Sequence, residues 1–376
     1  MTQNTVSLLR KLVSFNSVAP NELEIGKFLS KTLQDMGFSV ILQEVEKDRF
    51  NVLAEKGEGP AVMLYGHMDV VEVGEGWTYD PFDLKVEGDI VYGRGVHDMK
   101  GGIVSILEAV DGLDPKNIKI KVAFGVDEEQ ISSGSNVLAN SGWLSDVKFA
   151  IVPESNATSK YDGNIGLPLI VLGRRGRVPI SIKVHGKAAH AAKPENGINA
   201  ITDAVRIVEA INSMPIISNE KMGSGSVCVL SINSSAKSLT VPEDCEILVD
   251  RHYVPPETET QAVNQIKGII SSLGLKSNVI VEPIKRPTPF LIPYMTDEHH
   301  PYVEKLAEFV KEKYGRVEYG YGMSVADENC FGGRLGIPTV VIGPKGGNPH
   351  SVDEWASISS IEEVAALYRR FLQWLG

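Results

Sequence analysis

The sequence predicts an α/β fold in which a mostly parallel sheet is covered by helices. Three observations support this prediction. Strand-like and helix-like segments alternate through the first half of the chain, the same rhythm returns after Pro289, and a run with a different order lies between them. The 376 residues are enough for two domains, because single hydrophobic cores stop growing at roughly 250–300 residues.

The first region alternates between helices and short apolar strands. In the helices, apolar residues follow the i, i+3, i+4, i+7 spacing of one buried face, as in Ile103, Ile106, Leu107 and Val110. Strands that alternate with helices favour a parallel sheet that is buried on both faces. The predicted elements are a short amphipathic helix over 8–13, a helix over 22–36, strands over 40–45, 50–54 and 61–65, a helix over 103–110, and strands over 118–124 and 149–152.

From about position 175 the order changes to β-α-β-β-α-β, the ferredoxin-like pattern of a small two-layer domain. The α/β rhythm returns with a helix over 301–314, a strand over 339–342 and a last helix over 361–375. We therefore predict a first domain made of 1–174 and 286–376, and an inserted domain over 175–285. The predicted elements of the insertion are strands over 179–184, 226–232, 246–253 and 279–284, with helices over 198–211 and 261–273.

Composition excludes several classes of function. Apolar residues make up 43% of the chain and charged residues 23%, as in an ordinary globular protein. The 37 basic and 48 acidic residues leave a formal charge of -11, so neither nucleic acid nor an anionic membrane surface is an expected partner. No apolar run reaches the roughly 18–20 residues of a membrane span, and no secretory signal is recognisable. Cys228, Cys245 and Cys330 are odd in number and form no CxxC pair, which favours reduced thiols and a cytoplasmic location.

Several buried strands run directly into residues that can bind a metal. Four of these strand ends carry His67 to Asp69, Asp127 to Glu129, Glu154 and His350, and Asp98 lies in the loop before the 103–110 helix. In open α/β sheets ligands bind beyond the carboxyl ends of the strands, so these groups are expected to converge. Clustered carboxylates repel one another unless cations are present, and imidazole with carboxylate suits zinc, or else manganese or cobalt. The sequence thus predicts two divalent cations, about 3.5–4 Å apart, that share a carboxylate.

These residues belong to motifs that resemble those of the M20 metallopeptidases. That family includes succinyl-diaminopimelate desuccinylase, acetylornithine deacetylase, glutamate carboxypeptidases and aminoacylases. The resemblance covers nearly the whole chain and implies a zinc-exopeptidase-like catalytic domain with an inserted lid domain. The motifs, in the order of the family, are Gly66-His67-Met68-Asp69-Val70-Val71, the stretch from Gly93 to Gly102, Asp127-Glu128-Glu129, Pro153-Glu154, the stretch from His185 to Ala191, and His350-Ser351-Val352-Asp353-Glu354.

The resemblance also implies a role for each site residue. His67, Asp98 and Glu154 would hold one metal, and Asp98, Glu129 and His350 the other. Asp69 shares a strand face with His67 and would accept a hydrogen bond from its imidazole. Glu128 would act as general base on a metal-activated water and then pass the proton to the leaving nitrogen. Asp353 and Glu354 complete the last motif, although a solvated helix start explains them equally well.

The inserted domain is expected to contribute the remaining roles. In the family it pairs subunits, and the histidine that matches His190 reaches the active site of the other subunit, where it stabilises the oxyanion. Many members carry Asp-x-Arg in this domain, but the chain reads Asp250-Arg251-His252, so His252 takes the place of the arginine. The expected substrate-binding residues are therefore Arg251, His252 and Asn233, with Arg174, Arg175 and Arg177 as alternatives.

The chain is accordingly interpreted as a homodimeric hydrolase that cleaves the amide bond of an N-acyl amino acid or a small peptide. A deacylase or desuccinylase is favoured over the alternative, an M20 carboxypeptidase or dipeptidase. A non-catalytic binding protein of this fold would lack a ligand or the base, and all of them are present. A two-metal phosphoesterase is the third hypothesis, against which the acidic charge and the absence of a basic phosphate clamp in the sequence count.

Overall fold

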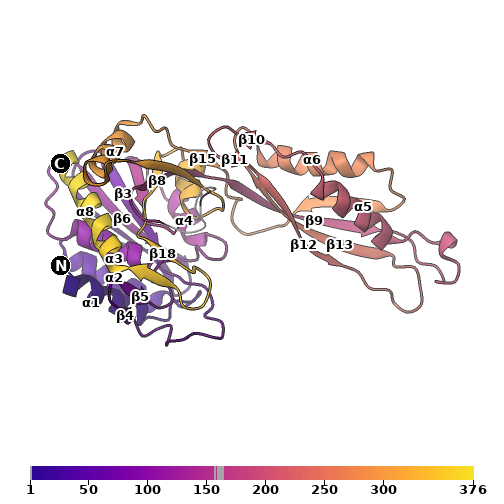
Figure 1. Cartoon of the computed structure of the whole chain (residues 1–376), viewed down its shortest axis with the longest axis horizontal. Helices are drawn as coiled ribbons and strands as arrows, with labels where there is room; N and C mark the ends of the chain where they lie inside the picture. The colour runs from indigo at the N-terminus through magenta and orange to yellow at the C-terminus, as the bar shows by residue number, and fades with distance from the viewer. Residues whose placement is uncertain (1, 156–157, 159–164) are drawn as a thin grey trace. The chain divides into compact units, whose positions relative to one another are not determined.

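The computed structural model describes residues 2–155, 158 and 165–376, and the chain divides into two compact units. Unit 1 contains Met1–Arg174, Pro287–Pro289 and Tyr294–Gly376, and unit 2 contains Arg175–Arg286 and Phe290–Pro293. Unit 2 is therefore an insertion into unit 1 (Figure 1). Among the described helices, none combines the length and the apolar character that a membrane span requires.

Unit 1 is built on a mixed sheet whose centre is parallel. The neighbours β6, β3, β7 and β17 pair in parallel, whereas the pairs β1–β2, β2–β6, β17–β8 and β15–β8 are antiparallel. Every residue of β3 is buried, as expected for a central parallel strand. In spatial order the strands are β1 (Ser39–Glu46), β2 (Arg49–Gly57), β6 (Lys119–Gly125), β3 (Ala61–His67), β7 (Val147–Val152), β17 (Thr339–Val341), β8 (Leu169–Arg174) and β15 (Tyr294–Met295), and β16 (Glu318–Gly322) pairs with β8.

Helices cover both faces of this sheet, which confirms the predicted α/β class. A Cβ at Gly26 of α2 would contact Val52, and Gly134 of α4 accepts a hydrogen bond from Asn51. Because Asn51 and Val52 are successive residues of β2, they point to opposite faces. The helices of unit 1 are α1 (Thr2–Val13), α2 (Leu23–Asp35), α3 (Lys100–Val110), α4 (Ser133–Asn140), α7 (Pro301–Tyr314) and α8 (Ile358–Leu375), with a π-helical segment η2 (Asn329–Arg334).

Unit 1 also contains a second, smaller sheet, two strands of which precede α3 in the sequence. It contains β18 (Gly346–Gly347), β19 (Trp355–Ser357), β5 (Ile90–Tyr92) and β4 (Lys85–Glu87), and all of its pairs are antiparallel. The strand β5 leads into the loop 93–99, and the segment between β18 and β19 contains His350. This small sheet therefore connects two loops that carry predicted metal ligands.

Unit 2 has the ferredoxin-like order that the sequence predicted. Its antiparallel sheet runs β12–β13–β9–β14, and one face packs its apolar side chains against α5 and α6. Along β9 the residues Val178, Ile180, Ile182 and Val184 are buried, and the residues between them are more exposed. The elements are β9 (Gly176–His185), η1 (Pro194–Asn196), α5 (Ala200–Asn212), β10 (Ser218–Asn219), β11 (Gly223–Ser224), β12 (Ser226–Asn233), β13 (Asp244–Tyr253), α6 (Glu259–Ser272) and β14 (Asn278–Pro283).

Candidate metal centre

The five expected metal ligands and the expected base, Glu128, all lie in unit 1. His67 is the last residue of β3, Glu128 and Glu129 follow β6, and Glu154 follows β7. These three strands are parallel neighbours, so their carboxyl ends lie at one edge of the sheet. His350 joins them from the segment between β18 and β19, and Asp98 joins them from the loop before α3.

A glycine allows α3 to approach the loop that carries Glu154. A Cβ at Gly102 would lie 2.4 Å from the carbonyl oxygen of Pro153, a distance that no side chain tolerates. The start of α3, and with it Asp98, can therefore come close to the end of β7 only because position 102 has no side chain.

Asp98 lies between two histidines. Its Oδ1 is 3.1 Å from Nε2 of His67, and its Oδ2 is 3.3 Å from Nε2 of His350. Oε2 of Glu154 is 3.4 Å from Nε2 of His67, and Oε2 of Glu129 is 3.0 Å from Nε2 of His350. The arrangement consists of two half-sites, each with one imidazole and one carboxylate of its own, which share Asp98. Single ligand atoms of His67, Asp98 and Glu129 also lie within 4.8 Å of one another.

The tautomer of His67 follows from its hydrogen bonds. Nδ1 lies 3.0 Å from the main-chain carbonyl oxygen of Asp69, which can only accept a hydrogen bond. The proton of a neutral His67 is therefore on Nδ1, and the lone pair of Nε2 points to the half-site. The sequence predicted that the carboxylate of Asp69 accepts this hydrogen bond, but its Oδ1 lies 3.6 Å from Nδ1.

The Asp69 carboxylate instead holds the segment after β6. Its Oδ1 accepts the backbone N–H of Glu128 at 3.1 Å, and its Oδ2 accepts that of Glu129 at 3.0 Å. Asp69 is fully buried, so both hydrogen bonds are shielded from water. Its position two residues after His67 thus connects β3 to the acids of the neighbouring strand.

The cluster holds more carboxylates than its two histidines can neutralise. Burial, followed by the charge of Asp98, raises the pKa of Glu129 to about 7 and that of Glu154 to about 8. Hydrogen bonds to Asp98 and Glu129 raise the pKa of His350 to about 10. In the absence of metal, protons on these side chains therefore offset the negative charge of the carboxylates, and bound cations would offset it in the same way. Imidazole nitrogens with carboxylate oxygens are a donor set that fits divalent zinc, manganese or cobalt.

Glu128 is half-buried and is not one of the ligands described above. Burial raises its pKa well above the usual range, and the neighbouring carboxylates of Glu129, Asp327 and Glu154 act in the same direction, against the opposing charge of His67. A carboxyl group with a raised pKa can both accept and donate a proton near neutral pH.

Asp127 belongs to the same motif but has a structural role. Its Oδ1 lies 3.1 Å from a guanidinium nitrogen of Arg49, which also pairs with Glu22, and its Oδ2 accepts the N–H of Ser133 at 3.2 Å. These contacts bend the chain directly before Glu128, and Asp127 itself has a φ of 68°. The family resemblance gave roles to the two acids that follow Asp127 but not to Asp127, and its burial and pairing explain the difference.

Glu354 differs from its sequence interpretation. It is fully buried, four residues before α8 begins, and its carboxylate accepts hydrogen bonds from the loop that carries Asp98. The alternative explanation, a solvated helix start, is therefore wrong for Glu354, which the motif also covers. The only sequence signal was its place in the motif after His350. Asp353 is half-buried, and its carboxylate accepts hydrogen bonds from Thr78.

The other predicted residues lie in unit 2. Arg251 is fully buried and donates to both carboxylate oxygens of Glu257, at 2.7 and 2.9 Å, so it presents no exposed guanidinium to a substrate. His252 is half-buried on the opposite face of β13, and Asn233 is exposed at the end of β12. His190 is exposed, and its Nδ1 accepts the N–H of Ala192 at 3.0 Å.

Two of the alternative arginines, Arg174 and Arg177, are also paired within their own units. Arg174 is buried and forms an ion pair with Glu328, and a second guanidinium nitrogen lies 3.1 Å from Oγ of Ser324. Arg177 pairs with Asp250 at 2.7 Å. Each of these guanidinium groups therefore already has a partner in the protein.

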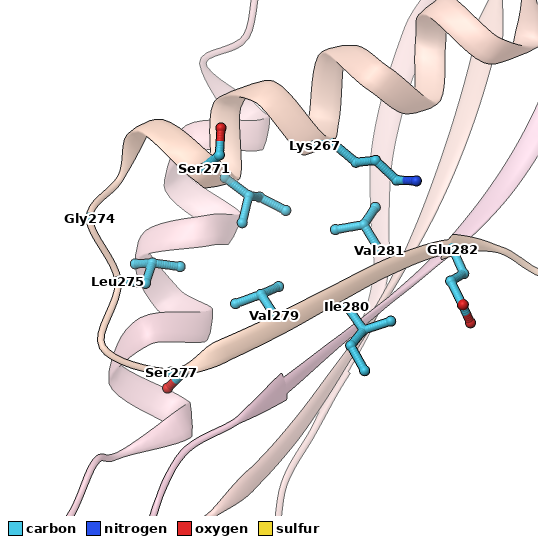
Figure 2. Close-up of a pocket in the computed structure, with 10 residues that line it drawn as sticks. Lys267, Ser271, Gly274, Leu275, Ser277, Val279, Ile280, Val281 and Glu282 are labelled. Carbon is cyan, nitrogen blue, oxygen red and sulfur yellow. The ribbon is translucent and has the colours of Figure 1, made fainter.

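Unit 2 contains a groove of about 600 Å³ between the end of α6 and the edge strand β14 (Figure 2). Lys267 and Glu282 are the charged residues of its lining, and no histidine or cysteine occurs among the described residues that line it. The groove therefore lacks the ligand set found at the strand ends of unit 1.

Comparisons with known proteins give the same family over most of the chain. Residues 63–374 match the model of Peptidase family M20/M25/M40. A curated succinyl-diaminopimelate desuccinylase from Wolinella succinogenes is 28% identical, with 100% of both chains covered. One from Ehrlichia chaffeensis is 26% identical over 99% of this chain and 98% of its own.

Solved structures share the fold. An aminopeptidase from Bacillus cereus superposes with a TM-score of 0.80 at 20% identity, covering 100% of this chain and 99% of its own. An M20 family metallo-carboxypeptidase from Sulfolobus solfataricus gives 0.77 at 19% identity, with 99% of both chains covered. A dinuclear metal-binding peptidase of the M20 family from Bacillus subtilis gives 0.73 at 16% identity, covering 99% and 97%. The chain therefore belongs to peptidase family M20/M25/M40 and is a hydrolase of that family.

Proposed function

We propose that the chain is a two-metal hydrolase that cleaves the amide bond of N-acyl amino acids. The observation that carries this proposal is the position of Asp98, whose two oxygens face His67 and His350 at 3.1 and 3.3 Å. A carboxylate shared between two imidazole-containing half-sites is the arrangement that a metal pair requires. Unit 1 would then be the catalytic domain, and unit 2 the lid and dimerisation domain.

His67, Asp98 and Glu154 would hold one divalent cation, and Asp98, Glu129 and His350 the other. Zinc suits this donor set best, and cobalt or manganese are alternatives. When bound, the cations supply Lewis-acid chemistry that acidifies water and polarises an amide carbonyl. The protein's part is to hold the ligands in place, which it does through the Nδ1–H of His67 and through the carboxylate of Asp69.

Glu128 is the proposed general base. Its carboxylate would take a proton from the attacking water and deliver it to the leaving nitrogen as the C–N bond breaks. Two features of the chain support this role. Its backbone N–H is held by Asp69, and burial raises its pKa well above the usual range of a carboxylate, which favours its acting as a proton acceptor and donor.

His190 is the proposed donor to the oxyanion. Because its Nδ1 accepts the N–H of Ala192, the proton of the neutral ring lies on Nε2. An exposed Nε2–H is the donor needed to stabilise negative charge on the carbonyl oxygen. In the proposed homodimer this group would act on the substrate of the other subunit.

The proposed dimer interface lies on one edge of unit 2. The strand β12 is an edge strand with unpaired main-chain groups, and it exposes Leu230 and Ile232 by 51% and 45%. The helix α5 contacts β12 and exposes Ile201 and Val205 by 38% and 46%. An exposed edge with apolar neighbours is a surface on which a second copy can extend the sheet.

We favour a deacylase or desuccinylase over a carboxypeptidase or dipeptidase, because curated relatives that match over the whole chain are named desuccinylases. His252 and Asn233 are the proposed contacts to the substrate, since Arg251 already pairs with Glu257.

A cytoplasmic location is proposed as well, and the three free cysteines agree with a reducing compartment.

A substrate panel tests the activity directly. The full chain, loaded in turn with Zn²⁺, Co²⁺ or Mn²⁺, is assayed on N-succinyl and N-acetyl amino acids, including N-succinyl-diaminopimelate, and on dipeptides and tripeptides. We expect release of succinate or acetate, with loss of activity after chelation and recovery when the metal returns.

The same panel separates the alternatives. Cleavage of peptides alone would replace the deacylase with a peptidase. No cleavage of any amide by a chain that holds two cations would overturn the proposed reaction. The subunit role of His190 is tested by mixing Glu128→Gln with His190→Ala chains, because a mixed dimer has one intact composite site and regains activity.

A further inference from the structure

We propose that Glu354 is a positioning residue that sets the place of Asp98 and thereby controls the affinity of both half-sites for metal. The inference rests on the proposed metal centre and concerns a residue outside the ligand set. It starts from a buried carboxylate on a segment that is distant in sequence from the loop it contacts.

The Glu354 carboxylate makes four hydrogen bonds, all to the loop 93–99 that carries Asp98. Its Oε1 accepts the N–H of His97 and the N–H of Asp98, both at 2.9 Å. Its Oε2 accepts the N–H of Gly95 at 2.9 Å and pairs with the guanidinium of Arg94 at 2.8 Å. The four donors use the lone pairs of both oxygens, so the carboxylate is saturated and its orientation is set.

Other contacts hold this loop as well: the carbonyl oxygen of Gly95 accepts the N–H of Lys100 at 2.7 Å, and Val96 is buried in the hydrophobic core. The residues from Gly95 to Asp98 belong to no strand or helix, and Gly95 itself has a φ of 83°. The imidazole of His97 is buried, and neither of its nitrogens has a hydrogen-bond partner in the described part of the chain. At Asp98 itself, the main-chain N–H groups of His97 and Asp98 are both held by Glu354, which anchors the backbone directly at the shared ligand.

The same segment also carries a ligand of the second half-site. His350 lies four residues before Glu354, between β18 and β19, and β19 pairs with β5, which leads into the loop of Asp98. The carbonyl oxygen of Glu354 accepts the N–H of Gly93 at 3.1 Å. Main chain and side chain of Glu354 thus join the loop of Asp98 to the segment of His350.

Loss of Glu354 has a specific expected effect on metal binding, because Asp98 belongs to both half-sites. A displacement of its backbone moves the oxygen that faces His67 and the oxygen that faces His350. Loss of the Glu354 carboxylate should therefore weaken the binding of both cations, whereas loss of the His350 imidazole should abolish the binding of one. A purely structural role for Glu354 would instead lower the stability of the metal-free chain and leave metal affinity unchanged.

The test is a calorimetric titration of the metal-free full chain, once with Zn²⁺ and once with Co²⁺. We compare the wild type, Glu354→Gln, His350→Ala and Asp353→Asn. In Glu354→Gln the amide NH2 faces backbone N–H donors, so we expect the dissociation constants of both cations to rise by about 10–100-fold. The His350→Ala variant should bind one of the two cations. The carboxylate of Asp353 contacts Thr78 and not the loop of Asp98, so the Asp353→Asn variant should bind both cations as the wild type does.

The melting temperature of each metal-free chain is measured in parallel. Should Glu354→Gln not fold, Glu354→Asp keeps the charge, shortens the side chain by one methylene, and carries the same expectation. Wild-type affinity in the folded Glu354 variant, or an equal loss in Asp353→Asn, would overturn the positioning role. A wild type that binds two cations but cleaves no amide overturns the proposed reaction and leaves this role standing, and a wild type that binds no cation overturns both.

Discussion

Asp69 accepts the backbone N–H of Glu128 through Oδ1, at 3.1 Å. Through Oδ2 the same carboxylate accepts the N–H of Glu129 at 3.0 Å. One buried side chain therefore orients two successive acids, of which one is the proposed base and the other a proposed metal ligand. Oε2 of Glu129 lies 3.0 Å from Nε2 of His350, a contact that separates its role from that of Glu128.

Replacement of Asp69 by Asn should lower kcat/KM by about 10–100-fold. The amide keeps one acceptor, but its NH2 faces a second N–H donor, so Glu128 and Glu129 shift. The measurement is steady-state kinetics on the best substrate of the panel, with metal content determined on the same sample. Kinetics equal to those of the wild type would show that the two hydrogen bonds do not matter for the reaction.

Glu128→Gln should retain both cations and lose activity by about 10²–10⁴-fold, because an amide cannot transfer the proton. Metal analysis and kcat are measured together. Glu44→Gln, an exposed acid on β1, makes the same chemical change away from the site and should behave as the wild type. If Glu128→Gln turns over at a normal rate, another group must be the base.

Metal affinity should fall as the pH falls. In the metal-free chain the pKa values of Glu129 and Glu154 are raised to about 7 and about 8, and that of His350 to about 10, so cations must displace protons from these groups. Each displaced proton weakens apparent binding by about tenfold for each unit of pH below its pKa. Zn²⁺ titrations between about pH 6 and pH 8 check this, and a constant affinity would contradict it.

The same shifts predict how the metal-free chain responds to pH. The folded state binds these protons more tightly than the unfolded chain, in which a glutamate has a pKa of about 4.3. Its stability should therefore decrease as the pH rises from about 4.3 through about 8, and bound cations should remove this dependence. Melting temperatures with and without Zn²⁺ measure the effect, and a metal-free chain that gains stability over this range would refute it.

Leu230→Glu should dissociate the proposed dimer, because a charge would be buried at the edge of β12. Sedimentation velocity measures the oligomeric state. Ile280→Glu provides the matched control, since Ile280 is 40% exposed on β14, the opposite edge of the same sheet, and should leave the dimer intact. A wild type that sediments as a monomer at all concentrations would exclude the dimer.

Much of the fold could be predicted from local patterns. The apolar periodicity over 301–314 located α7, and the alternation over 179–184 located β9. The short helix α4 and the strand β8 were not predicted. The helix α4 begins with Ser133-Gly134-Ser135, residues that mark no apolar face, and β8 is a continuous apolar run without alternation.

Short motifs in the sequence are enough to identify His67, Asp98, Glu129, Glu154 and His350 as candidate metal ligands, because these residues stand at strand ends and in loops that the motifs mark. The contacts that hold those groups in place could be seen only once the chain was folded. The hydrogen bonds of Glu354 to the loop of Asp98 join positions more than 250 residues apart, and the pair of Arg251 with Glu257 turns an expected substrate contact into a buried one. Periodicity encodes which face of an element is buried, but the partner of a buried polar group depends on how distant segments pack.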